Sequence, residues 1–301
     1  MKLGMRKTMA LVAGLAAMVA GLACSCSKDE DGKEQEEWRT ESKVVAGQVG
    51  SGNLRIARTL DHHYFYGEDG EVQSVKTSMW GEPFVFGKGM SSVSMKMDRE
   101  MEAGVWHHID IKYDKFRFNE QGYVVSFNFK RVYDKIVTEG KFSCSYNEDG
   151  TISLAKISES AMGNQSQKTI KYEYSNGKLL KIKSVSANDF SIIIDYLYDD
   201  EPVRNPLRMT CTAFTYVYRL SGSSALIFHS LYDLGYLGTR CAYLPSSMNV
   251  TNGIQGDLSA ESKFTVPFKY SFREDGTIYD DEYGVYEYEN HPVPSFEGGG
   301  R

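Results

Sequence analysis

Aromatic and polar residues alternate along much of this chain, in short units that repeat. In the clearest unit, Ile170-Lys171-Tyr172-Glu173-Tyr174, apolar side chains occupy every second position and charged ones lie between them. Because successive side chains of a β-strand point to opposite faces, this period of two predicts strands with one apolar face. Related units are Tyr64-x-Tyr66, Phe116-x-Phe118, Phe142-x-Cys144-x-Tyr146 and Phe268-x-Tyr270-x-Phe272.

A short polar turn that ends in glycine follows each unit, and an aliphatic residue comes two positions later. Glycine tolerates the positive φ angles that tight hairpin turns require, as Asp and Asn do to a lesser degree. The units therefore predict β-hairpins. The turn glycines are Gly70, Gly122, Gly150, Gly177 and Gly276.

The spacing of these turns predicts one large β domain over residues 53–294. Gly122, Gly150 and Gly177 lie 28 and 27 residues apart, and the same spacing over residues 53–290 implies roughly 14–18 strands. Neighbouring strands of such a meander pair antiparallel. A sheet of this size usually curls or closes to protect its edges, so we expect a barrel or a strongly curved sheet.

One stretch departs from the hairpin pattern and predicts a single short helix, over residues 224–234. Leu226, Leu231 and Leu234 fall near one helical face. Ser223 or Ser224 is suited to cap its start, and Gly235 to end it. We expect its leucines to pack against one open end of the curved sheet or inside it, because an empty apolar interior is costly.

The N-terminus predicts export and lipid anchoring. Residues 1–26 contain three basic residues, then an apolar stretch of 15 residues, which suits a signal peptide and is too short to span a membrane. Cys24 and Cys26 both follow small residues, as lipid attachment requires. The sequence then turns polar at Ser27, which favours Cys26, with Cys24 as the alternative. An ordinary secreted protein is the competing interpretation.

Composition sets the remaining boundaries. Residues 27–52 are charged, with few large apolar side chains, and are expected to form a flexible tether. Residues 295–301 are expected to form a loose tail.

The net charge of the whole chain is -6, and removal of residues 1–26 leaves 31 basic and 40 acidic residues, a net charge of -9. This charge disfavours nucleic acid as a partner, and also direct attraction to anionic lipid.

At this point the motifs resemble a known family. The unit Tyr172-x-Tyr174-x-Asn176-Gly177-x-Leu179 is similar to the YD repeats of RHS proteins. With the lipoprotein-like signal and the motifs that follow, the chain resembles a Bacteroidetes family of secreted lipoproteins of unknown function with a porin-like β-barrel fold. Those motifs are Tyr196-x-Tyr198-Asp199-Asp200, Asn205-Pro206, Leu234-Gly235-Tyr236, Leu244-Pro245-Ser246-Ser247 and Tyr270-x-Phe272-x-x-Asp275-Gly276.

The resemblance implies an outer-membrane, cell-surface location but no site residues. It covers residues 140–290 best. A lipid anchor and a C-terminus that is not an aromatic-ended strand favour a porin-like but soluble barrel over a membrane-spanning one. The expected partner is outer-membrane lipid, through the acylated cysteine.

The titratable residues give weak signals for chemistry. His62-His63 and His107-His108 are tempting metal ligands, but neighbours on a strand point to opposite faces, so neither pair chelates alone and we expect no metal. Cys211 and Cys241 flank the expected helix and are candidates for a disulfide, with buried free thiols as the alternative. The acidic runs at 199–201 and 280–282 are read as solvated turns rather than calcium loops.

No catalytic motif occurs, and no cofactor is expected. The sequence lacks a Gly-x-Ser-x-Gly elbow, a phosphate-binding glycine loop and a His-Glu-x-x-His pair. We therefore predict a non-enzymatic surface lipoprotein that binds or scaffolds, with a glycan or an envelope protein as partner. The alternative is a polysaccharide hydrolase. Its two catalytic acids would have to lie in a cleft, about 5–10 Å apart.

Overall fold

The structure is a computed structural model and describes residues 44–50, 53–59, 62–77, 82–102, 104–186, 190–219, 225–254 and 262–290. The predicted signal peptide with Cys24 and Cys26, and the predicted tail 295–301, lie outside these ranges. In the part of the chain that is described, no helix is long and apolar enough to cross a membrane.

Strands dominate the fold, as the alternating pattern predicts. The helical elements are η1 (Lys88–Met90), α2 (Thr212–Arg219) and α3 (Ala225–Asp233). The strands are β1 (Leu54–Thr59), β2 (His62–Tyr66), β3 (Val72–Thr77), β4 (Phe84–Phe86), β5 (Ser92–Glu102), β6 (Val105–Phe118), β7 (Val124–Tyr133), β8 (Ile136–Tyr146), β9 (Ile152–Ala161), β10 (Asn164–Ser175), β11 (Lys178–Ser186), β12 (Phe190–Leu197), β13 (Val203–Arg204), β14 (Tyr243–Leu244), β15 (Ser247–Ile254), β16 (Ser262–Pro267), β17 (Ser271–Phe272), β18 (Ile278–Asp280) and β19 (Tyr286–Asn290).

Fifteen of these strands form one antiparallel sheet. Strands β1 to β12 follow one another as a meander, β15 and β16 extend it on one side, and β19 pairs with β1 on the other. The described parts of β16 and β19 are therefore the two edges, and the sheet is the strongly curved, open alternative rather than a closed barrel. Two small two-stranded sheets lie outside it: β13 paired with β14, and the hairpin β17–β18.

The predicted glycine turns are confirmed. Gly70, Gly150 and Gly276 have φ angles of 80° to 81°, and each follows an aspartate. The side chain of that aspartate accepts the backbone N–H two residues further on, as Asp149 does from Thr151 at 3.0 Å. Asn176 and Gly177 both have positive φ, as expected for a two-residue hairpin loop.

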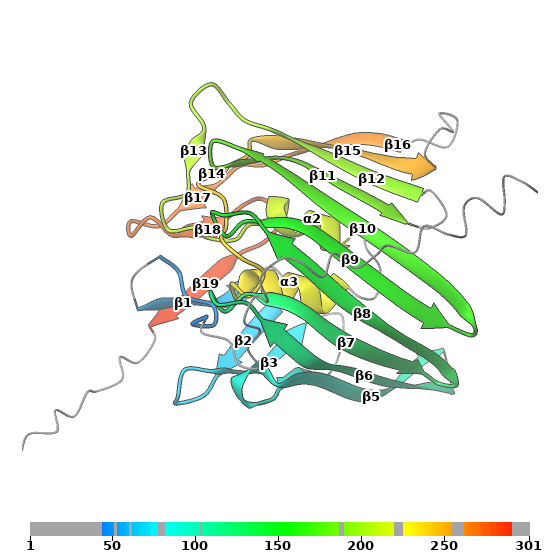
Figure 1. The fold of residues 1–301 in the computed structure, drawn as a ribbon. Helices are drawn as coiled ribbons and strands as arrows, with labels where there is room; N and C mark the ends of the chain where they lie inside the picture. Colours follow the sequence, from blue (N-terminus) through cyan, green and yellow to red (C-terminus); the bar gives the residue numbers. More distant parts are fainter. Residues whose placement is uncertain are drawn as a thin grey trace, which may run out of the picture. The chain divides into compact units, whose positions relative to one another are not determined.

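Two helices, and not the single helix expected, pack against one face of the sheet (Figure 1). The Phe228 ring of α3 lies 5.8 Å from that of Phe127 on β7 and 4.8 Å from that of Phe142 on β8. On α2, the Ala213 carbonyl accepts a hydrogen bond from the Tyr196 hydroxyl on β12. Helix α2 was missed because its sequence, TAFTYVYR, is rich in β-branched and aromatic residues.

The leucines of α3 pack inward as predicted. Leu231 and Leu234 are fully buried, in a core that includes the first aromatic side chain of each repeat unit, such as Tyr64 and Phe116. The side chain of Leu226 is outside the described set. A later tyrosine of several units donates to a backbone carbonyl, as the Tyr146 hydroxyl does to that of Val124 at 2.5 Å.

Residues 44–50, which we call the strap, belong to the domain and not to a flexible tether. Ala46 and Val49 are buried in the core. The N–H groups of Gly47 and Gly50 donate to the carbonyls of Leu234 and Leu207, each at 3.0 Å. The expected boundary at residue 53 was therefore too late, because the charged residues before the strap dominate the composition of this region.

A buried carboxylate ties α3 to the sheet. Asp233, fully buried at the end of α3, accepts hydrogen bonds from the hydroxyls of Thr59 on β1 and Tyr64 on β2. The Thr210 hydroxyl donates at 2.8 Å, and His229 Nε2 lies 3.3 Å away. Burial alone would raise the pKa of Asp233, but these partners, His229 foremost, hold it well below its usual range.

Replacing Leu231 with Asp tests the packing of α3. We expect the free energy of unfolding to fall by about 3–5 kcal/mol, because the variant buries an unpaired charge. Thermal melts measure this, with Leu180→Asp, at a position 40% exposed on β11, as the control. An unchanged melting midpoint for Leu231→Asp would mean that α3 is not packed in the core.

Replacing Asp233 with Asn tests the buried network. At pH 7 we expect a loss of about 2–4 kcal/mol, since four polar partners lose their charged acceptor. Because the folded pKa is depressed, the Asp233 contribution is present above about pH 4 and is lost as pH falls below it. Denaturant unfolding at pH 7 and pH 3 should thus show a smaller difference from wild type at pH 3. Exposed Asp200→Asn is the control; a pH-independent difference would contradict the prediction.

Candidate functional site

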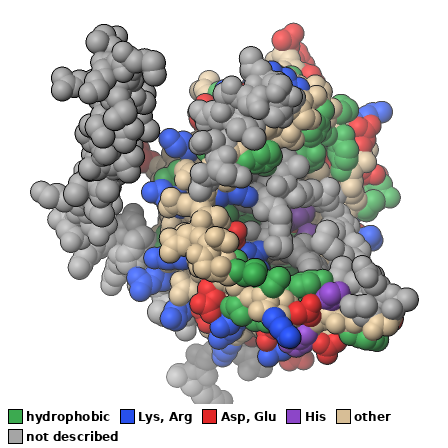
Figure 2. Space-filling model, turned by 90° about the vertical axis from the view of Figure 1, so that its right-hand side faces the viewer, with side chains coloured by type: hydrophobic (Ala, Val, Ile, Leu, Met, Phe, Trp, Pro, Cys, Tyr) green, Lys and Arg blue, Asp and Glu red, His purple; other side chains and the backbone are tan. Residues whose placement is uncertain are grey.

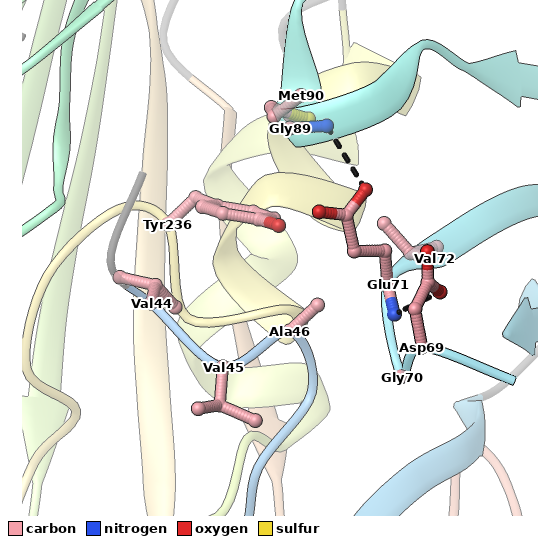
Figure 3. A pocket seen from close by; sticks show the side chains of 10 residues that line it. All are labelled: Val44, Val45, Ala46, Asp69, Gly70, Glu71, Val72, Gly89, Met90 and Tyr236. Carbon is pink, nitrogen blue, oxygen red and sulfur yellow. Dashed lines mark hydrogen bonds between the residues drawn. The ribbon is translucent and has the colours of Figure 1, made fainter. Parts of the chain in front are cut away.

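A pocket of about 290 Å³ lies where the strap, the β2–β3 turn, η1 and the end of α3 meet. We call it the strap pocket (Figure 3). Valine, alanine and methionine side chains line it together with two carboxylates and one phenol. The lining residues are Val44, Val45, Ala46, Asp69, Gly70, Glu71, Val72, Gly89, Met90 and Tyr236.

The hairpin turn between β2 and β3 positions Glu71. The Gly67 N–H donates to the Glu71 carbonyl at 2.9 Å, and Asp69 Oδ1 accepts the Glu71 N–H at 3.0 Å. The half-buried Glu71 side chain then extends toward η1, where Glu71 Oε2 accepts the Gly89 N–H at 2.9 Å. The turn and η1 thus fix the carboxylate in one orientation.

The end of α3 positions Tyr236 on the opposite wall. The Gly235 N–H donates to the Tyr232 carbonyl at 3.0 Å, and the Tyr236 N–H to the Leu231 carbonyl at 2.8 Å. With Gly235 at a φ of 84°, this is a Schellman motif, which ends the helix and directs Tyr236 away from it. The side chain of Tyr236 is 5% exposed.

The Tyr236 hydroxyl and the Glu71 carboxylate point toward each other across the pocket (Figure 3). Among the described residues, the Tyr236 hydroxyl has no hydrogen-bond partner, and only one Glu71 oxygen has one, the Gly89 N–H. Burial, and then the negative charge of Glu71, raise the pKa of Tyr236, so its hydroxyl keeps its proton. The pocket thus offers one donor and one charged acceptor above an apolar wall.

The described chemical groups of the pocket are two carboxylates, one phenol and apolar side chains. Among the described lining residues there is no His, Cys, Ser, Thr or Lys. The two carboxylates, Asp69 and Glu71, come from the same turn and lie on the same wall (Figure 3). A glycosidase places its two carboxylates on opposite sides of the scissile bond.

The histidines that resemble catalytic groups are enclosed in the core. His229 is 4% exposed and His62 is 2% exposed, with their ring centroids 4.2 Å apart. Both lie beside Asp233, and none of the three lines the strap pocket. The His229–Asp233 pair connects α3 to β1 and β2 inside the core, through Asp233.

The second histidine pair, His107 and His108, lies at the surface, and each histidine contacts a different aspartate. His107 Nδ1 lies 2.6 Å from Asp134 Oδ2, and His108 Nδ1 lies 2.8 Å from Asp98 Oδ1. Figure 2 shows exposed histidine side chains among acidic and basic ones. Within the described ranges, no three His, Cys, Asp or Glu side chains lie close enough to hold a metal ion.

The described cysteines, Cys144, Cys211 and Cys241, are free thiols. Cys211 and Cys241 are buried and free, so the predicted disulfide is not formed in this structure and its formation in an oxidising compartment stays a prediction. Burial raises the pKa of Cys144 and of Cys241 to about 12 and also raises that of Cys211. Thiols of this kind are poor nucleophiles at neutral pH.

The acidic run at residues 280–282 has a structural role at its centre. Asp281 is fully buried, and its Oδ2 accepts the Thr212 N–H at the start of α2 at 2.7 Å and the Tyr286 hydroxyl at 2.7 Å. This carboxylate caps α2. Asp199, Asp200 and Glu201 follow β12 and are exposed or half-buried, as expected of a surface turn.

The residues of the strap pocket were not identified from the sequence. Glu71 was read only as part of a repeat turn, and Tyr236 only as part of the Leu234-Gly235-Tyr236 motif. The one available signal was that Glu71, unlike the residue after Gly150 or Gly276, is charged. The pocket exists only because four segments of the chain meet there: the strap, the β2–β3 turn, η1 and the end of α3.

Two porin-like proteins of Bacteroides are among the solved structures that match this chain at low identity. No protein-family profile and no curated protein matches it. A porin-like protein from Bacteroides vulgatus has 14% identity and a TM-score of 0.47, over 79% of this chain and 99% of that one. One from Bacteroides uniformis has 13% identity and a TM-score of 0.26, over 66% and 93%. The family resemblance of the sequence stays a prediction.

Proposed function

We propose that this chain is an exported, lipid-anchored protein of the bacterial outer membrane that binds a small ligand group in the strap pocket and does not transform it. Export and anchoring rest on the signal-like residues 1–26 with Cys24 and Cys26. Binding rests on one observation: the hydroxyl of the buried Tyr236 and one Glu71 oxygen face a cavity without a partner among the described residues.

Polar groups in such positions normally have partners. Buried hydroxyl and carboxylate oxygens without one cost free energy, so water or a ligand is expected to satisfy them. A cavity of about 290 Å³ is large enough for a ligand group. The glycan or envelope protein expected from the sequence would therefore present a small polar group here.

A hydrolase of polysaccharides is the rival function. It predicts turnover, whereas binding predicts a complex that leaves the ligand unchanged. Chromatography of each glycan after incubation separates the two. Shortened products that disappear in Glu71→Gln would favour the hydrolase.

The anchoring proposal predicts where the protein partitions. Wild type should sediment with membranes. The Cys24→Ser/Cys26→Ser double variant should be released, because it has no cysteine to carry the acyl chains on which stable attachment depends. The single variants identify the acylated residue, and Cys144→Ser is the control. A double variant that still sediments with membranes would refute lipid anchoring.

The binding proposal predicts that filling the pocket abolishes binding. The Ala46 side chain points toward Glu71 (Figure 3), so Ala46→Leu should occupy the space a ligand needs. Ligands found by screening glycans, peptides and small metabolites by NMR should lose most of their affinity for this variant. Val85→Leu, at a position 53% exposed on β4, places the same leucine side chain elsewhere and should bind as wild type does. Ligands that bind Ala46→Leu equally well use another site.

A further inference from the structure

We propose that the strap pocket is a site for an aliphatic primary ammonium group, as carried by a lysine side chain or a diamine. This inference rests on the proposed binding function and adds the chemical class of the ligand. It depends on three properties of the pocket: the sign of its charge, the geometry of its free polar atoms and the apolar character of its other walls.

The charge of the lining favours a cation. Asp69 and Glu71 are the carboxylic acids among the described lining residues, and none of the described lining residues is Lys, Arg or His. Lys88 is adjacent to Gly89 in sequence, but its side chain is exposed and it does not line the pocket. Anionic ligands such as phosphates and free carboxylates would therefore be repelled, and a cation attracted, more strongly than at an open surface.

The free polar atoms suit a group that donates several hydrogen bonds. Glu71 has one carboxylate oxygen left as an acceptor, since the other accepts the Gly89 N–H. The Tyr236 oxygen across the pocket also has lone pairs to accept with. An ammonium group has three donors, so it would bond both atoms at once, and charge-assisted bonds of this kind are the strong ones.

The remaining walls suit a methylene chain. Ala46, Val72 and Met90 are buried and Val44 is half-buried, and all four contribute apolar surface. The volume of about 290 Å³ exceeds what an ammonium group alone would fill. An alkylammonium would bury its stem against these side chains while its charged end meets Glu71 and Tyr236.

Titration calorimetry of the full domain with two amines tests the proposal. The probes are 1,5-diaminopentane and Nα-acetyl-lysine methylamide, which separate a free diamine from a peptide lysine as the source. Nε-acetylation of the second probe removes the charge and should abolish binding. Raising the salt concentration to about 0.5 M should weaken binding, because it screens the charges.

Three variants assign the binding to this pocket. Glu71→Gln keeps an acceptor for the Gly89 N–H and should lower the affinity about tenfold or more, and Tyr236→Phe about three- to tenfold. Glu68→Gln is the matched control: Glu68 is exposed in the same turn, does not line the pocket and should bind within about twofold of wild type. Thermal melts establish that each variant is folded.

The outcomes distinguish the ligand class from the function. If methyl glycosides bind in a Tyr236-dependent way and the amines do not, the ammonium proposal is wrong and the binding function stands. If Nε-acetylated and free lysine bind equally, charge does not select the ligand and the proposal is also wrong. If neither amines nor glycosides bind and the screen yields no pocket-dependent ligand, both proposals fail.

Discussion

A sheet of fifteen strands with one continuous apolar face must cover that face, and the rest of this structure follows from that requirement. Each unit of the repeat adds buried aromatic and aliphatic side chains to the same face, among them Phe127, Phe142 and Ile170. Left open to water, this surface would be strongly unfavourable. The sheet curves around α2 and α3, so that strands far apart in sheet order, such as β2, β8 and β12, all contact these helices (Figure 1).

Two buried carboxylates hold the helices in position against this apolar face of the sheet. Asp233 joins the end of α3 to β1 and β2, and Asp281 joins the start of α2 to β19 through Tyr286. A buried charge is tolerated only where hydrogen bonds compensate its lost hydration. Each carboxylate has several such bonds, which gives the helices defined positions that apolar packing alone specifies less sharply.

The strap pocket is a consequence of how the helix α3 ends. The Schellman motif at Gly235 directs Tyr236 away from the helix, and the same helix end accepts the Gly47 N–H from the strap at the Leu234 carbonyl. The turn before β3 then places Glu71 opposite. The pocket therefore lies on hydrogen-bonded, rigid elements, which is the arrangement that holds a binding group in position.

Local sequence determined the strands, the turns and the inward face of α3. Alternation at period two and glycine turns are properties of a few adjacent residues, so they are visible in Tyr172-x-Tyr174 or Asp149-Gly150 without any knowledge of the fold. Leu231 and Leu234 showed which face of the expected helix would be buried. The same local view failed at α2, whose TAFTYVYR sequence favours a strand and becomes helical where Asp281, 69 residues away, caps its first turn.

Only the tertiary structure decided where the strap, the histidines and the candidate site lie. Val49 is buried although the chain before the strap is highly charged, because Gly47 and Gly50 beside it donate to the distant carbonyls of Leu234 and Leu207. His62 and His229, 167 positions apart, also meet in the core. Glu71 and Tyr236 form a candidate binding site only because they face each other across the strap pocket. Long-range contacts of this kind depend on the sheet order and its curvature, which no local pattern of residues encodes.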